Sequence, residues 1–195
     1  MISLLSAKAV DVFVDWKVIT ESDRELYAYG FFMLFSEVFY LFASAFIGAL
    51  FGITIESVVF FTLFSILRGY AGGIHANSER VCLVSTLGSI FISVFFIWIG
   101  SHFALSIPFV LLLAINMPIV LVLSPQDTMT KRLTIEEKKL YRRKTTIVIL
   151  AILLLCGIVN KTHMSNLFYC CSVCVTLESA LLVLGILFEE NNNNK

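Results

Sequence analysis

Long apolar runs alternate with short polar segments along the whole chain. The apolar runs cover residues 26–50, 53–67, 81–100, 103–123, 145–159 and 166–188. A helix needs about 20 apolar residues to cross a bilayer, so most of these runs are long enough. The run 53–67 is shorter, which fits a short, tilted or re-entrant span. The pattern predicts an all-α, polytopic membrane helix bundle with about six hydrophobic helical segments, forming one integral membrane domain over residues 1–195.

The two ends of the chain differ from these runs. In residues 1–20, apolar side chains recur every three or four positions, from Ile2 and Leu5 to Trp16, while Lys8 and Asp11 lie on another face. This predicts an amphipathic helix in the membrane interface, with docking of a partner helix as the alternative. Residues 189–195 are low in complexity and predict a disordered tail.

Composition supports the membrane class and excludes others. The 195 residues are 58% hydrophobic and 14% charged, whereas soluble domains carry about 25% charged residues. The formal net charge is zero, which argues against a nucleic-acid partner, because such binders carry excess Lys and Arg. An odd number of cysteines, five, argues against a full disulfide framework. We expect no metal site and no cofactor.

The segment 124–144 is strongly basic and predicts the orientation of the chain in the membrane. Its positive residues outnumber its three acidic ones; they are Lys131, Arg132, Lys138, Lys139, Arg142, Arg143 and Lys144. Loops of this kind remain on the cytoplasmic side, so 124–144 is predicted to be cytoplasmic. Because 81–100 and 103–123 both cross, the polar segment 68–80 is predicted to lie on the cytoplasmic side too.

The segment 68–80 and the start of the next span carry the candidate chemistry. They contain Arg68, Gly72, Gly73, His75 and Cys82. A thiol nucleophile needs a base or an electropositive neighbour to form the thiolate. His75 is the candidate base, and the start of a helix favours an anion at Cys82. Arg68 is a candidate for holding a peptide carboxylate or stabilising an oxyanion.

Spacing adds a condition to this interpretation. Residues seven apart on one straight helix differ by about 10 Å in rise, which is too far for a hydrogen bond between His75 and Cys82. The chain must therefore break between them, and Gly72 with Gly73 makes a turn sterically easy. Asn77 or Ser78 is the expected N-cap of the following helix. Each residue alone also has a simpler interpretation: a packing thiol, a solvated imidazole, a plain turn.

The motif Arg68-x-x-x-Gly72-Gly73-x-His75-Ala, followed by Cys82, resembles the accessory gene regulator B (AgrB) family. These proteins are membrane cysteine endopeptidases of Gram-positive quorum sensing. The likeness extends over most of the chain, including the amphipathic N-terminus and the basic central loop. It implies that Cys82 is the nucleophile and His75 the base, and that homodimers form. It leaves the third catalytic partner open, and neither Glu79 nor Ser85 is assigned to that role.

The resemblance also implies a substrate and a course of reaction. The substrate is an AgrD-like propeptide with an amphipathic leader. Its acidic C-terminal part leaves as Cys82 forms a thioester, and a Cys or Ser of the peptide then closes a thiolactone or lactone ring. A basic cluster is the candidate for binding the acidic end: Lys138, Lys139, Arg142, Arg143 and Lys144. The same cluster also fits a simple topology signal and contact with anionic lipid.

Two other functions remain open at this point. Glu37 and Glu178 are carboxylates within apolar runs, which are costly in lipid, so a small transporter could use them as a proton or ion relay. The pair Cys171 and Cys174, with Cys170 and His163 nearby, would suit a thiol oxidase, although packing thiols are the simpler interpretation.

The predicted orientation leads to a labelling test. A membrane-impermeant thiol reagent is expected to modify Cys82 from the cytoplasmic side, because 68–80 precedes a span that starts there. The measurement compares labelling from each face of the membrane, with Cys82→Ala as the background control. Labelling of Cys82 only from the outer face would overturn the orientation.

Overall fold

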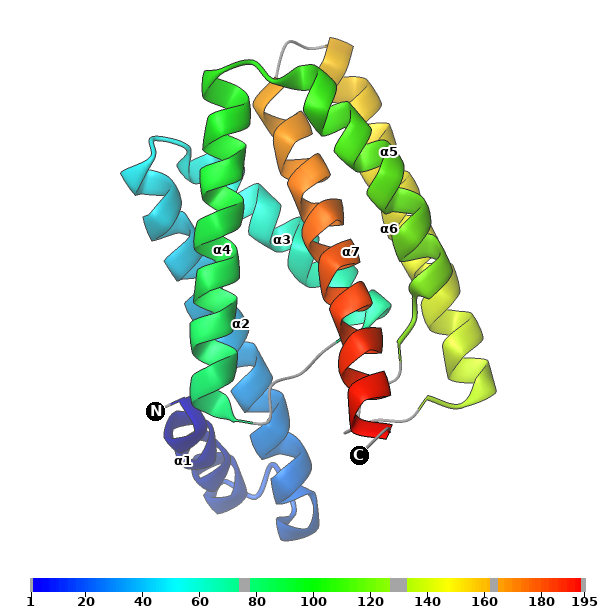
Figure 1. Ribbon diagram of the computed structural model, residues 1–195. Helices are drawn as coiled ribbons and strands as arrows, with labels where there is room; N and C mark the ends of the chain where they lie inside the picture. Colours follow the sequence, from blue (N-terminus) through cyan, green and yellow to red (C-terminus); the bar gives the residue numbers. More distant parts are fainter. Residues whose placement is uncertain (1, 74–77, 127–132, 162–164, 194–195) are drawn as a thin grey trace. The chain divides into compact units, whose positions relative to one another are not determined.

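A computed structural model describes residues 2–73, 78–126, 133–161 and 165–193 (Figure 1). Within these ranges every regular element is helical, which confirms the all-α prediction. The helices are α1 (Ile2–Asp15), the 3-10 turn η1 (Glu21–Asp23), α2 (Arg24–Leu50), α3 (Thr54–Ala71), α4 (Glu79–His102), α5 (Ser106–Leu123), α6 (Ile135–Lys161) and α7 (Ser165–Asn193).

Five helical stretches in the described part of the chain are long and apolar enough to cross a membrane. They are Glu21–Leu50, Thr54–Ala71, Glu79–His102, Ser106–Leu123 and Asn166–Phe188. The protein is therefore a multi-pass membrane protein. The helix that contains the short run 53–67 is longer than the run itself, because α3 continues to Ala71. In α6 the first three turns are charged, and its apolar part begins at Thr145.

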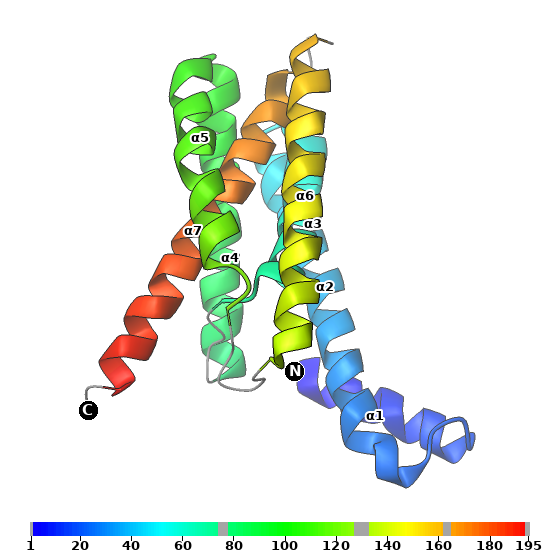
Figure 2. The ribbon, with the colours of Figure 1, turned by 90° about the vertical axis from the view of Figure 1, so that its right-hand side faces the viewer.

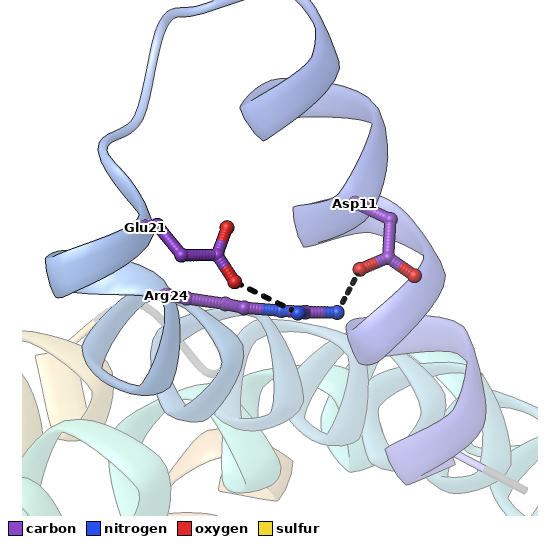
Figure 3. A network of polar contacts seen from close by, with 3 residues as sticks. All are labelled: Asp11, Glu21 and Arg24. Atoms are coloured by element: carbon purple, nitrogen blue, oxygen red, sulfur yellow. Dashed lines mark hydrogen bonds and ion pairs between the residues drawn. The ribbon is translucent and has the colours of Figure 1, made fainter.

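Two compact units make up the chain, 1–43 and 44–195, and α2 contributes to both. In the first unit, α1 is joined to the start of α2 through Arg24. Its guanidinium forms ion pairs with Asp11 of α1 and with Glu21 of η1, the latter at 3.0 Å (Figure 3). Phe13 stacks on Phe31 with ring centroids 5.3 Å apart. The helix predicted in 1–20 is thus present, and its location in the membrane interface stays a prediction.

In the second unit, α7 is the central helix. It packs against α3, α4, α5 and α6, and in Figure 1 it runs between α4 and the pair formed by α5 and α6. Small side chains on α7 allow the neighbouring helices to pack closely against it. Three of them are fully buried: Cys170, Cys171 and Cys174. Ser172 is also buried and donates a hydrogen bond to the Phe109 carbonyl of α5, at 2.7 Å. Figure 2 shows α7 crossing the other helices of this unit obliquely.

A local sequence signal explains the start of α6. Thr134 and Glu137 form a reciprocal capping box at the start of α6: the Thr134 amide donates to the Glu137 carboxylate at 2.9 Å, and the Glu137 amide donates to the Thr134 hydroxyl at 3.3 Å. At the other end of the chain, α7 continues to Asn193. The helix therefore extends into residues 189–195, which the sequence predicts as a disordered tail.

Close helix packing at Gly100 generates a stability prediction. A Cβ atom there would lie 2.7 Å from the Tyr169 ring and 2.8 Å from the Phe109 ring. Gly100→Ala is expected to destabilise the protein by about 1–3 kcal/mol, the usual cost of overpacking. Gly88→Ala is the matched control, since it lies on the same helix with nothing within 4 Å. Unfolding in mixed micelles measures both, and equal stability of the two variants would contradict this packing.

Candidate functional site

The first turn of α4 carries the candidate nucleophile. Ser78 is the N-cap: its hydroxyl accepts a hydrogen bond from the Val81 amide at 3.3 Å, and its carbonyl accepts one from the Cys82 amide at 2.9 Å. Cys82 is thus the fourth residue of α4, and its side chain is partly exposed. The prediction of a cap at Ser78 is confirmed. The dipole of α4 favours negative charge near this first turn.

The chain breaks between α3 and Cys82, as the proposed chemistry requires. Helix α3 ends at Ala71 and α4 begins at Glu79, so Gly72, Gly73 and Ser78 belong to neither helix. His75 lies outside the described residues, as does Asn77, the alternative cap. The pairing of His75 with Cys82 therefore stays a prediction.

The glycine pair is required by backbone conformation and by crowding. Gly72 has φ +81° and ψ −148°, a region that is essentially restricted to glycine, and Gly73 has φ +114°. A Cβ on Gly72 would lie 2.5 Å from the Gln126 carbonyl oxygen, and one on Gly73 would lie 2.2 Å from Arg68 Nη1. Both glycines thus lie against other parts of the protein, which spacing alone does not reveal.

Arg68 pairs with Glu178 in the interior of the second unit. Arg68 belongs to the last turn of α3, and its Nη1 lies 3.7 Å from Oε1 of Glu178 on α7. The side chains are 19% and 0% exposed, respectively. The sequence analysis assigned Arg68 to a peptidase and Glu178 to the alternative function, a transporter. The structure instead brings them together beside the glycine turn.

Gln126 is a residue of this site that sequence reasoning missed. Its backbone amide donates to the Ala71 carbonyl at 3.0 Å, and its side-chain amide donates to the Leu182 carbonyl of α7 at 2.6 Å. It therefore joins the end of α3 to α7. No sequence signal marks it, because a single Gln after an apolar run resembles any loop residue.

The predicted basic cluster lies on the first turns of α6. The cluster residues Lys138, Lys139, Arg142 and Arg143 are exposed. Lys144 is half-buried, and its ammonium lies 5.1 Å from the ring centroid of Tyr70 and 5.9 Å from that of Tyr141. Cation–π contacts of this kind attach α6 to the last turn of α3. The cluster residue Lys144 thus adjoins the helix end that carries Arg68.

The other cysteines lie away from Cys82. Cys156, Cys170, Cys171 and Cys174 are free and buried in α6 and α7. Cys156 belongs to the last part of α6 and the other three to the first part of α7, whereas Cys82 belongs to the first turn of α4. Cys170 donates to the Glu56 carbonyl at 3.3 Å. Their burial and this hydrogen bond favour a packing role for these thiols. His163 lies outside the described residues.

Comparison with known proteins identifies the family. The sequence model described as "Accessory gene regulator B" matches residues 6–183. The chain belongs to the AgrB family. The match covers the whole motif from Arg68 to Cys82 and confirms the resemblance drawn from it.

Two curated relatives support the assignment. A putative AgrB-like protein of Clostridium perfringens (strain SM101 / Type A) is 30% identical over 174 residues, covering 85% of this chain and 78% of the relative. A putative AgrB-like protein 2 of Clostridium perfringens (strain 13 / Type A) is 32% identical over 139 residues, covering 67% and 64%. No solved structure shows a significant match. Membership of the AgrB family implies involvement in the peptide processing of agr quorum sensing.

The glycine turn generates a prediction for Gly72→Ala. The substitution forces an L side chain into a disfavoured conformation and against the Gln126 carbonyl, so a loss of about 1–3 kcal/mol of stability is expected, together with reduced peptide processing. Gly69→Ala is the matched control, since it lies three residues away with nothing within 4 Å. Thermal unfolding and processing of a co-expressed propeptide measure the effect. Full stability and full processing in Gly72→Ala would contradict the crowded turn.

Proposed function

We propose that this protein is a membrane cysteine endopeptidase that removes the C-terminal part of an AgrD-like propeptide and promotes its cyclisation. The observation that carries the proposal is the placement of Cys82 in the capped first turn of α4, a helix separated from α3 by the segment that begins at Gly72 and Gly73. Family membership supports it independently. The proposed location is the cytoplasmic side of the cell membrane of a Gram-positive bacterium.

Cys82 is the proposed nucleophile. Its partly exposed thiol is accessible to a peptide, in contrast to the four buried cysteines. The thiol lies at the N-terminal turn of α4, where the helix dipole favours negative charge that develops during the reaction. The apolar body of α4 follows directly, so the thiol lies at the margin of a hydrophobic span.

His75 is the proposed base and acid. It takes the thiol proton, and the Cys82 sulfur attacks the scissile carbonyl carbon to form a tetrahedral intermediate. The C–N bond then breaks, the leaving amine takes the proton from His75, and a thioester with Cys82 remains. Next, a thiol or hydroxyl of the peptide loses its proton to His75 and attacks this thioester. The ring closes, and the Cys82 sulfur leaves and regains the proton.

Cyclisation has to compete with hydrolysis of the thioester. Restriction of water around the acyl group favours attack by the peptide's own nucleophile, which is held nearby. In this proposal, the apolar side chains around the first turns of α4 restrict the access of water. Arg68, Gly72 and Gly73 have a supporting role in this proposal, at the end of α3 and in the turn that follows it.

The basic cluster of α6 is the proposed contact for the acidic end of the propeptide. Its members are Lys138, Lys139, Arg142, Arg143 and Lys144. Four of them are exposed, and the Lys144 contact with Tyr70 keeps the cluster beside the end of α3. The lipid bilayer and a second copy of the chain complete the proposed partners, with no residue assigned to a dimer interface.

The transporter alternative has less support. Glu178 is engaged with Arg68, and Glu37 belongs to the other unit of the chain. Ion-coupled flux that is lost in Glu37→Gln but retained in Cys82→Ala would favour a transporter.

The proposed function predicts the behaviour of two substitutions. Cys82→Ala is expected to abolish release of the C-terminal fragment, because no nucleophile remains. His75→Ala is expected to lower release by about 10²- to 10⁴-fold, the usual contribution of a general base. The measurement is co-expression with the propeptide, followed by mass spectrometry of the fragment. Normal release by Cys82→Ala would end the peptidase proposal.

Matched controls separate the chemistry from the mere loss of a thiol or an imidazole. Cys156→Ala removes a buried thiol of α6, and His102→Ala removes the exposed imidazole at the other end of α4. Both are expected to process the propeptide normally. A propeptide without its ring-forming nucleophile should accumulate as a thioester on Cys82 that hydroxylamine releases.

A further inference from the structure

Glu178 is a buried carboxylate of α7 that forms an ion pair with Arg68 of α3. It is 0% exposed and lies in the middle of α7. Among the described residues neither of its oxygens accepts a hydrogen bond, and the Arg68 guanidinium lies 3.7 Å away. A charge in such surroundings is costly unless an opposite charge compensates it. Glu178 and Arg68 therefore hold each other in place.

The same guanidinium lies directly against the glycine turn. The space where a Cβ of Gly73 would lie is occupied by Arg68 Nη1, at 2.2 Å. The conformation of Arg68 thus restricts where Gly73 lies, and Glu178 restricts the conformation of Arg68. Gly73 is two residues before His75.

A second contact holds the other side of the turn. Gln126 donates its backbone amide to the Ala71 carbonyl and its side-chain amide to the Leu182 carbonyl. The Gln126 carbonyl in turn lies where a Cβ of Gly72 would be. Glu178 and Leu182 are one helical turn apart and so share a face of α7. One face of α7 therefore anchors both sides of the turn.

We propose that Glu178 and Gln126 are positioning residues that hold the Gly72–Gly73 turn, which lies two residues before His75 in the sequence, on α7. The proposal rests on the proposed peptidase function for its catalytic consequence. Glu178 acts through Arg68, and Gln126 acts through Ala71 and Gly72. Neither residue is assigned a contact with the propeptide.

Kinetics of the isosteric variant Glu178→Gln test the proposal. It removes the charge that holds Arg68, so kcat for release of the C-terminal fragment is expected to fall by about tenfold to 100-fold, as small misplacements of catalytic groups do. KM is expected to change little, because no substrate contact is removed. The assay uses the full chain in liposomes with a synthetic propeptide. An unchanged kcat in Glu178→Gln, with Cys82→Ala inactive, overturns the positioning role and leaves the peptidase proposal standing.

Glu56→Gln is the matched control. Glu56 is also a carboxylate of the α3–α7 contact, where it accepts a hydrogen bond from Asn166 at 3.0 Å, but it lies near the opposite end of α3. Its kcat is expected to remain at the level of the unmodified protein. An equal fall in both variants would show a general effect on helix packing and would overturn the specific role of Glu178.

A double-mutant cycle tests whether Glu178 acts through Arg68. If it does, Arg68→Gln combined with Glu178→Gln is expected to have the same kcat as Arg68→Gln alone, because the interaction is already lost. If the two substitutions act independently, the fold-losses in kcat multiply in the double variant. That result would overturn the proposal that Glu178 acts through Arg68.

Hydrogen exchange supplies a readout that does not depend on activity. Peptides that span residues 68–73 are expected to exchange faster in Glu178→Gln than in Glu56→Gln, since the turn loses its anchor. Unchanged exchange overturns the proposal whatever the activity, whereas release by Cys82→Ala refutes the peptidase function alone. If Glu178→Gln does not accumulate in the membrane, Gln126→Ala replaces it in the kinetic and exchange measurements, because it removes the bond to Leu182 from a partly exposed position.

Discussion

The ion pair between Arg68 and Glu178 is the interaction on which the candidate site depends. The buried Glu178 carboxylate has an opposite charge beside it in Arg68, and a buried carboxylate that loses such a partner is strongly destabilising. The pair joins the last turn of α3 to the centre of α7. Since α7 also packs against α4, α5 and α6, the position of this one contact is defined by the whole second unit.

Crowding around the pair explains why the turn is made of glycines. Arg68 lies against Gly73, and Gln126 lies against Gly72, while both of these larger residues bind α7. The backbone that follows α3 therefore has Gln126 against Gly72 and Arg68 against Gly73.

Much of this architecture follows from local sequence rules. Apolar runs predicted the helices, the Ser78 cap follows from residue type, and the glycine pair was recognisable as a turn. The length of α3 was underestimated, because Arg68 and Gly69 resemble the start of a loop, whereas the charge of Arg68 is compensated by a residue far along the chain. The roles of Glu178 and Gln126 could not be predicted, since periodicity describes one segment at a time and both roles arise between segments.

The basic residues of α6 have a consequence for affinity. Sequence analysis placed them in a loop, but the capping box at Thr134 starts the helix before them. Their spacing is therefore set by the helix backbone, and Lys144 is further held by two aromatic rings. A flexible loop would have to become ordered when an anionic peptide binds these residues. The backbone of α6 is already ordered, so less of the favourable electrostatic free energy is lost to conformational entropy. The helix backbone therefore sets the spacing of these charges before any anionic ligand binds.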